Sequence, residues 1–149
     1  MIIRRALRED LAKIVALLVD DVLGKAQDHA VVDEAYEKAF EAVQADPRNE
    51  LVVVEDGGEV VACLQVTYIP GLGRHGAERT LVEAVRVRSD LRGRGIGEQL
   101  MGWVVDRAQA RSCGLVQLTP KVTHRRPSLL RAARLRPQPC RHEADPVAE

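Results

Sequence analysis

A glycine-rich turn between a strand and a helix constrains the fold of this 149-residue chain most strongly. The turn, residues 92–97, reads RGRGIG and separates a strand-like segment from apolar residues at helical spacing. Glycines let the backbone adopt positive φ angles and approach a ligand closely. The helix N-terminus offers unpaired N–H groups, and Arg92 and Arg94 add cationic donors. The turn is therefore suited to a phosphate or pyrophosphate, although an ordinary connection with solvated arginines would have the same sequence.

Two common nucleotide-binding motifs do not fit this turn. A P-loop requires Lys followed by Ser or Thr after the last glycine, and Glu98-Gln99 stands there instead. The dinucleotide-binding motif belongs to a first strand–helix unit near the start of a parallel sheet. Here the turn comes late, after a hairpin turn predicted at Asp56-Gly57-Gly58. Both motifs are therefore disfavoured.

Hydrophobic periodicity predicts a mixed α/β domain with the order β-α-α-β-β-β-α-β. The predicted strands are 2–6, 51–55, 59–68, 80–88 and 115–118; the predicted helices are 11–22 before a stop at Gly24, 32–45, and one that follows the glycine turn and ends at Gly114. In the fourth strand, alternation predicts Leu81, Glu83, Val85 and Val87 on one face and Val82, Ala84, Arg86 and Arg88 on the other.

The cysteines indicate reduced thiols in a cytoplasmic protein. Cys63, Cys113 and Cys140 are an odd number without metal-ligand spacing, so no metal site is predicted. We expect Cys63 and Cys113 to pack as small core residues. No apolar run approaches the roughly 20 residues of a membrane span, and no signal-peptide pattern is seen. The sequence therefore predicts no membrane partner.

The motif Arg92-x-x-Gly95-x-Gly97, together with the order of elements, resembles the GCN5-related N-acetyltransferase (GNAT) family. The resemblance covers roughly residues 1–119 and implies the GNAT fold, a mixed central sheet flanked by helices. It implies acetyl-CoA as cosubstrate, its pyrophosphate held by the turn and its pantetheine arm paired with the fourth strand. The implied cosubstrate contacts are Val85, Arg86 and Val87 on the strand, and Arg92, Gly93, Arg94, Gly95, Ile96, Gly97 and Glu98 at the turn.

The resemblance also implies direct transfer of an acetyl group to the primary amine of a small molecule. Such a reaction needs a base that deprotonates the ammonium form of the substrate. Glu83 is the predicted base, because it lies in an apolar strand just before the turn, where many family members carry a glutamate with this role. A strand-edge glutamate that faces water or pairs with Arg86 explains the sequence as well.

Two further residues are candidate substrate contacts. His75 lies in a loop that the family often uses near the acceptor, although a lone loop histidine is more often solvated. Tyr68, with Ile69 and Leu72, could line the substrate pocket, although packing at the end of a strand explains these residues equally well. The second helix and the loop from 69 to 79 are expected to shape this pocket.

The composition changes after about Thr119. Residues 1–119 carry 15 Lys and Arg against 19 Asp and Glu, whereas residues 120–149 carry 7 against 3. Five of the seven prolines and none of the aromatic residues lie in this tail. The resemblance implies a phenylalanine–tyrosine pair here, whose tyrosine usually protonates the leaving thiolate, but Leu130 stands near that place. The chain therefore divides into an N-acetyltransferase domain, 1–119, and a basic tail, 120–149.

A one-base frameshift near the codons for Thr119 and Pro120 accounts for the tail. Permitted codons for residues 129–136, read from the second base, spell FYERLGF, which is the missing family pattern. The alternative is a genuine basic, proline-rich extension.

Three functions follow from the sequence. The first is an acetyl-CoA-dependent N-acetyltransferase, as a monomer or as the homodimer common in the family. The second is a catalytically impaired acyl-CoA-binding domain without the general acid. The third is a nucleic-acid-binding module, ranked last because the tail has no aromatic residues for base stacking; its candidate residues are Arg125, Arg126, Arg131, Arg134, Arg136 and Arg141.

Overall fold

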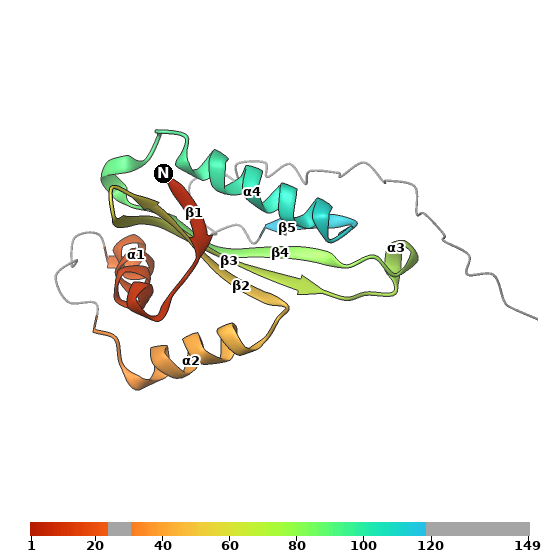
Figure 1. The fold of residues 1–149 in the computed structure, drawn as a ribbon, viewed down its shortest axis with the longest axis horizontal. Coiled ribbons are helices and arrows are strands. Elements are labelled where there is room, and N and C mark those ends of the chain that lie inside the picture. Colours follow the sequence, from red (N-terminus) through yellow and green to blue (C-terminus); the bar gives the residue numbers. More distant parts are fainter. Residues whose placement is uncertain (24–30, 119–149) are drawn as a thin grey trace, which may run out of the picture.

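A five-stranded mixed sheet forms the centre of the protein in the computed structural model, which describes residues 1–23 and 31–118 (Figure 1). The strands are β1 (Ile2–Arg5), β2 (Asn49–Asp56), β3 (Glu59–Ile69), β4 (Arg79–Val87) and β5 (Leu115–Leu118). They lie side by side in chain order, antiparallel up to β4, and β5 joins β4 in parallel. Positive φ angles at Gly57 and Gly58 form the tight turn between β2 and β3, as the sequence predicts.

Helices cover both faces of the sheet (Figure 1). α1 (Leu11–Leu23) and α2 (Glu34–Ala45) lie on one face and α4 (Ile96–Ala110) on the other, while the short α3 (Gly73–Gly76) lies between β3 and β4. Single 3-10 turns, Arg8–Asp10 and Ser89–Leu91, precede α1 and α4. The predicted order of elements and the mixed α/β class are thus confirmed.

The ends of the helices follow from local capping. α2 begins two residues after its predicted start, because the Asp33 carboxylate accepts a hydrogen bond of 3.0 Å from the Tyr36 N–H and fixes the N-cap. The predicted stop of the first helix at Gly24 lies outside the described residues. No helix in the described part of the chain is long and apolar enough to cross a membrane.

Each face of the sheet has its own hydrophobic core. The core under α4 includes Val52, Val54, Val61, Ala62, Leu64, Val66, Tyr68, Val82, Ile96, Leu100, Val104, Ala108, Cys113 and Val116. The core under α1 and α2 includes Ala6, Leu11, Ile14, Val15, Leu17, Phe40, Val53, Val60 and Cys63. The expectation that Cys63 and Cys113 are core residues is confirmed, because both are buried free thiols; Cys140 lies outside the described residues.

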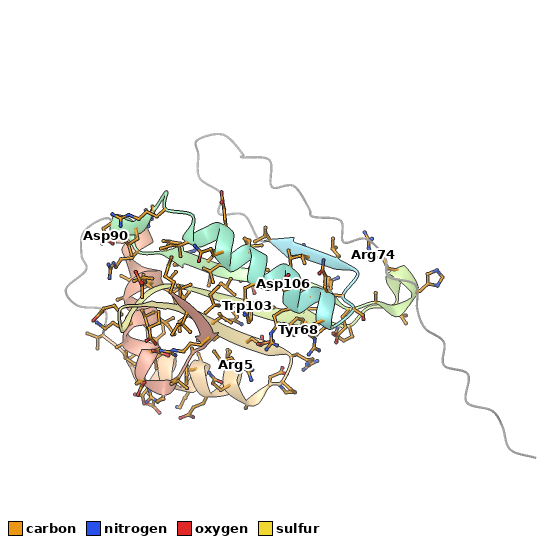
Figure 2. All side chains as sticks on the ribbon, turned by 45° about the horizontal axis from the view of Figure 1, so that its top comes forward. Arg5, Tyr68, Arg74, Asp90, Trp103 and Asp106 are labelled. Carbon is orange, nitrogen blue, oxygen red and sulfur yellow. The ribbon has the colours of Figure 1, made fainter. Side chains whose placement is uncertain are left out.

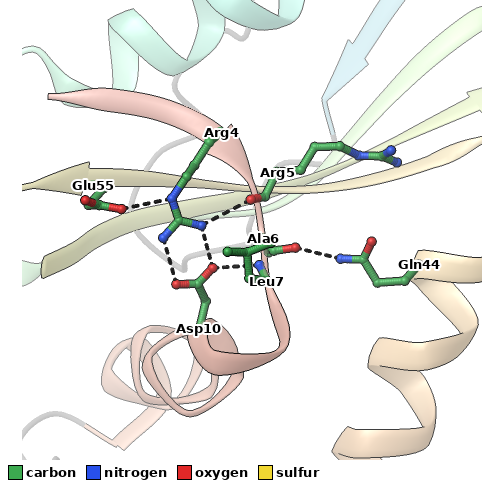
Figure 3. A network of polar contacts seen from close by, with 7 residues as sticks. All are labelled: Arg4, Arg5, Ala6, Leu7, Asp10, Gln44 and Glu55. Carbon is green, nitrogen blue, oxygen red and sulfur yellow. Dashed lines mark hydrogen bonds and ion pairs between the residues drawn. The ribbon is translucent and has the colours of Figure 1, made fainter. Parts of the chain in front are cut away.

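A polar network joins the edge strand β1 to the start of α1 and to α2 (Figure 3). Arg4 on β1 donates hydrogen bonds of 2.7 and 3.0 Å to the two carboxylate oxygens of Asp10, and one of 2.9 Å to Glu55 on β2. Asp10 also accepts a hydrogen bond of 2.7 Å from the Leu7 N–H. Gln44 on α2 donates to the Ala6 carbonyl at 2.8 Å. These contacts fix the positions at which α1 begins and α2 ends against the sheet.

Candidate functional site

A β-bulge interrupts the middle of β4. Gln65 on β3 pairs with Glu83, but Cys63, two residues away, pairs with Arg86, so β4 contains one extra residue in this interval. The bulge includes Ala84, whose φ angle of 52° lies in the left-handed region that non-glycine residues rarely adopt. The alternation of side chains therefore shifts by one position halfway along the strand.

This bulge overturns the predicted faces of β4. Val85 and Val87 pack against the core under α4, together with Val82, rather than sharing a face with Glu83. Arg86 and Glu83 both lie on the face of the sheet opposite α4. Their partners on β3, Cys63 and Gln65, have the same orientation in the sheet. The prediction of strict side-chain alternation along β4 is wrong because no glycine or proline in the sequence indicates a bulge there.

The second half of β4 exposes a strand edge. β5 pairs in parallel with Arg79 to Val82 only, so among the described residues no strand pairs with the same side of 83–87. The Arg88 N–H donates a hydrogen bond of 2.9 Å to the Val61 carbonyl on β3. In an extended strand the N–H groups of successive residues point in alternate directions. The N–H groups of Val85 and Val87 therefore point away from β3. An extended ligand could therefore hydrogen-bond to this edge as an added strand.

The glycine turn leads from the end of β4 into the first turn of α4. Gly93 and Gly95 both have φ angles of 79°, and Gly95 is the N-cap of α4 without any side-chain cap. The first N–H groups of an α-helix have no partner within the helix. A Cβ built at Gly93, Gly95 or Gly97 would meet no described atom within 4 Å, so the space beside the turn is open where a side chain would lie. The turn can therefore receive an anion.

Buried and polar contacts hold the turn in place. Ile96, the first residue of α4, is buried in the core under the helix, and Leu91 packs against the same core. Arg92 donates to the Val87 carbonyl at 3.2 Å, and Arg88 forms an ion pair of 2.7 Å with Asp90. Arg94 and Glu98 are exposed beside the helix N-terminus. The open amides are therefore presented by an anchored backbone.

A cavity of about 110 Å³ lies on the opposite face of the sheet, between α1, α2 and the strands. It is lined by Leu11, Ile14, Val15, Leu18, Tyr36, Ala39, Phe40, Val43, Leu51, Cys63, Gln65 and Ala84. Ala84 belongs to the β4 bulge, so the cavity extends to β4, whose edge facing away from β3 is the open one. We call this cavity the apolar pocket.

Glu83 lies beside the apolar pocket. It is exposed, and its direct partner across the ladder is Gln65, a pocket-lining residue. Side chains of directly opposed residues point to the same face, with Cβ atoms about 5 Å apart. The structure therefore brings together the predicted base, the predicted cosubstrate strand and the pocket.

Cys63 is not a competing nucleophile in this site. The thiol is fully buried, and its sulfur lies 3.8 Å from the Ala84 carbonyl, to which it donates a weak hydrogen bond. Burial raises the pKa of the Cys63 thiol to about 12, an effect that the positive charge of Arg86 only partly opposes. Because the thiolate is the reactive form, Cys63 stays an inert thiol at neutral pH.

His75 lies far from these groups along the β3–β4 hairpin. It is exposed in α3, where Arg74 and His75 have φ angles of 56° and 57°. Figure 2 shows Arg74 and Asp90 at opposite ends of the sheet, so the loop of His75 and the glycine turn are separated by the length of β4. The structure does not bring His75 together with the glycine turn.

Tyr68 is a core residue and does not line the apolar pocket. It is 1% exposed and packs in the core under α4. Its hydroxyl donates a hydrogen bond of 2.8 Å to the buried carboxylate of Glu50, which also pairs with Arg107 at 2.9 Å. The Arg111 guanidinium stacks on the ring, 3.9 Å from its centroid. Of the packing and substrate interpretations of Tyr68, the structure supports packing.

The second helix lines the apolar pocket through Tyr36, Ala39, Phe40 and Val43. The loop from 69 to 79 lines a separate hollow next to Leu115. That the second helix and this loop shape the acceptor pocket stays a prediction. The contributions of α1 and β3 were missed because their apolar residues repeat at core spacing, and nothing in that pattern distinguishes a filled core from a hollow one. Leu130 and the rest of 119–149 lie outside the described residues.

Comparisons with known proteins agree with this architecture. A sequence model of the acetyltransferase (GNAT) family matches residues 12–133. The solved structure of a transcriptional regulator from Bacillus halodurans C-125 is 42% identical, with a TM-score of 0.74 over 80% of this chain and 81% of that one. No match is found among curated protein sequences.

More distant structures share the fold. Glucosamine-6-phosphate N-acetyltransferase from Arabidopsis thaliana is 22% identical, with a TM-score of 0.69 over 81% of this chain and 82% of that one. A protein from Clostridium acetobutylicum described as a predicted acetyltransferase, solved with acetyl-CoA, is 15% identical, with a TM-score of 0.64 over 80% of each chain.

Proposed function

Because the chain belongs to the GNAT acetyltransferase family, we propose that it transfers an acetyl group from acetyl-CoA to the primary amine of a small molecule. The observation that carries the proposal is the continuity of the open edge of β4 with the glycine turn of α4. The two features form one path, because β4 ends at Val87 and the turn begins at Arg92, which bonds to the Val87 carbonyl.

The residues of this path fit the chemistry of acetyl-CoA. The amides of Val85 and Val87 are suited to the carbonyl groups of a pantetheine arm lying as an added strand. Uncapped amides at a helix N-terminus suit a pyrophosphate, and the empty space in front of Gly93, Gly95 and Gly97 leaves room for it. Arg92 and Arg94 can add charge-assisted hydrogen bonds.

Acetyl-CoA supplies a thioester as the acetyl donor. Glu83 is exposed and ready to take a proton from the ammonium form of the acceptor, which frees the nitrogen lone pair for direct attack. In the balanced reaction an N–C bond forms and the C–S bond breaks. One ammonium proton goes to Glu83, and the second proton that the nitrogen loses goes through solvent to the departing thiolate, which leaves as the thiol of CoA. The buried, inert thiol of Cys63, the cysteine beside Glu83 and the pocket, argues against transfer of the acetyl group through that residue.

The absence of a tyrosine from the tail favours a second candidate function. The two tyrosines of the chain are Tyr36 and Tyr68, and the hydroxyl of Tyr68 is buried against Glu50. A chain without a group that protonates the thiolate would bind acyl-CoA but turn over slowly. The second candidate is therefore an acyl-CoA-binding domain with impaired catalysis.

Two measurements test the proposal on the full chain. Isothermal titration calorimetry with acetyl-CoA tests cosubstrate binding, and folded protein that does not bind contradicts both candidate functions. Thiol release in the presence of a panel of primary amines then separates them. Release that depends on the amine supports the acetyltransferase, whereas binding without amine-dependent release supports the binding domain.

A further inference from the structure

The apolar pocket carries information about the acceptor, and this inference rests on the proposed function. None of its twelve lining residues is charged, and the polar side chains among them are Tyr36, Cys63 and Gln65. The Gln65 amide already donates to Asn49 at 3.3 Å, and the Cys63 thiol donates toward Ala84. The pocket therefore offers few free hydrogen-bonding groups to a ligand.

A polar acceptor would bind there at a cost. Hydroxyl or phosphate groups that enter an apolar site lose their hydrogen bonds to water without gaining new partners. The free-energy cost of this desolvation is larger for a charged group. Among the described residues that line the pocket there is no Lys or Arg that could receive a phosphate. The chemistry of these described lining residues therefore disfavours a sugar phosphate of the kind named for the Arabidopsis enzyme, with which this chain shares the fold.

The size of the pocket suits a compact apolar group. Its volume of about 110 Å³ is of the same order as the ~150 Å³ apolar cavity that holds a benzene molecule in another protein. Phe40 and Val15 are buried walls, whereas the lining residues Tyr36 and Ala39 are exposed to solvent. A ligand group can therefore reach the pocket from the surface.

The position of the pocket sets where the amine would lie. Ala84 lines the pocket, and Glu83, its neighbour in the chain, shares a sheet face with the lining residue Gln65. The carboxylate of Glu83 is the charge complementary to an ammonium group. The open edge of β4 begins at the same bulge.

We infer that the acceptor is a primary amine with a compact apolar substituent, an aryl or short alkyl group that occupies the apolar pocket while its ammonium group lies at Glu83. Burial of the substituent provides affinity, and Glu83 selects the cation and takes its proton. Specificity then lies in the walls of α1 and α2 rather than in hydrogen bonds to the substituent.

The first test compares 2-phenylethylamine, ethanolamine and glucosamine 6-phosphate in the thiol-release assay at saturating acetyl-CoA. We expect kcat/KM for 2-phenylethylamine to exceed that for ethanolamine by at least about tenfold, as is typical when an apolar group fills an apolar pocket. Equal or better use of ethanolamine or glucosamine 6-phosphate would overturn the inference and leave the acetyltransferase proposal intact.

A matched pair of variants on α2 locates the effect. Ala39 lines the pocket and Ala42 is not among its lining residues. Both side chains are exposed, so α2 should tolerate a larger residue at either position. Ala39→Phe fills the pocket and should raise KM for 2-phenylethylamine at least about tenfold. Ala42→Phe should leave it unchanged, and neither variant should change acetyl-CoA affinity. Equal effects of the two variants would overturn the inference.

Calorimetry separates this inference from the proposed function. The titration of 2-phenylethylamine into protein mixed with CoA measures acceptor binding without turnover. Binding that Ala39→Phe weakens and Ala42→Phe does not supports the pocket assignment even if catalysis is absent. Folded protein that binds acetyl-CoA but not 2-phenylethylamine overturns the pocket assignment, whereas failure to bind acetyl-CoA contradicts the proposed function.

Discussion

The guanidinium of Arg4 holds the carboxylate of Asp10 at two points, with Nη1 2.7 Å from Oδ2 and Nη2 3.0 Å from Oδ1. The same carboxylate accepts the Leu7 N–H, so it joins the end of β1 to the turn that starts α1 (Figure 3). Because α1 forms one wall of the apolar pocket, this ion pair positions the candidate acceptor site as well as the fold.

Asp10→Asn should destabilise the protein by about 2 kcal/mol, because it removes a charge-assisted pair from a mostly buried site. The hydrogen bonds from Arg4 lower the pKa of Asp10 below its usual range. A lowered pKa in the folded state gives stability that is complete above the unfolded carboxyl pKa of about 4 and is lost as pH falls through the folded value. Urea unfolding should therefore show the largest difference from wild type near pH 7.

The control for this variant is Asp106→Asn, at an exposed carboxylate on α4. It should change stability by less than about 0.5 kcal/mol, as is usual for surface substitutions. A pH-independent loss in Asp10→Asn would contradict the ion-pair argument.

Gly95→Val should weaken acetyl-CoA binding at least about tenfold by calorimetry. The φ angle of 79° at Gly95 is strained for a β-branched residue, and the added side chain would occupy the open space before the helix amides. Gly102→Ala is the matched control in the middle of α4, where a Cβ meets no atom within 4 Å. Gly102→Ala should raise the free energy of unfolding by about 0.5–1 kcal/mol and leave the affinity for acetyl-CoA unchanged. Unaltered acetyl-CoA binding by Gly95→Val would argue against the turn as the pyrophosphate site.

Glu83→Gln should lower turnover by about 10²–10⁴-fold, the usual contribution of a general base, while acetyl-CoA affinity stays within about twofold. The measurement is a pH series of kcat/KM for thiol release, with Glu41→Gln, an exposed carboxylate on α2, as control. If both enzymes follow the same pH profile with equal rates, Glu83 is not the base.

Tyr68→Phe should cost about 1–2 kcal/mol of stability, because it leaves the buried Glu50 carboxylate without one of its hydrogen bonds. The acceptor KM should not change, since Tyr68 packs in the core under α4, on the other face from the pocket. Thermal unfolding and thiol release measure the two effects. A rise in KM without a loss of stability would instead make Tyr68 a substrate contact.

The encoding DNA tests the origin of the tail. We expect the second-base frame across the codons for residues 118–145 to spell FYERLGF and its surroundings without a stop. Restoration of the missing base should then restore the phenolic acid and raise the rate of thiol release. Stops or unrelated codons in that frame would make the tail the protein's own and favour the acyl-CoA-binding domain.

The sequence predicted the order of elements and the glycine turn because both depend on local signals. Hydrophobic periodicity and glycine spacing are properties of neighbouring residues, and they placed β1 to β5 and the start of α4 correctly. The face of Val85 was predicted wrongly, since the bulge at Ala84 depends on pairing with β3 rather than on local preference. The membership of the apolar pocket also depends on how two helices and three strands meet, which an apolar pattern does not specify.

The in-order arrangement of the strands has a consequence for synthesis on the ribosome. Neighbouring strands in the sheet are neighbours in the chain, so β2, β3 and β4 form a meander with short connections. Closing these short loops costs little conformational entropy. Every residue of the apolar pocket has been made by the time Ala84 leaves the ribosome. The glycine turn and α4 follow, so the acceptor half of the candidate site can form before the half that would hold the donor exists.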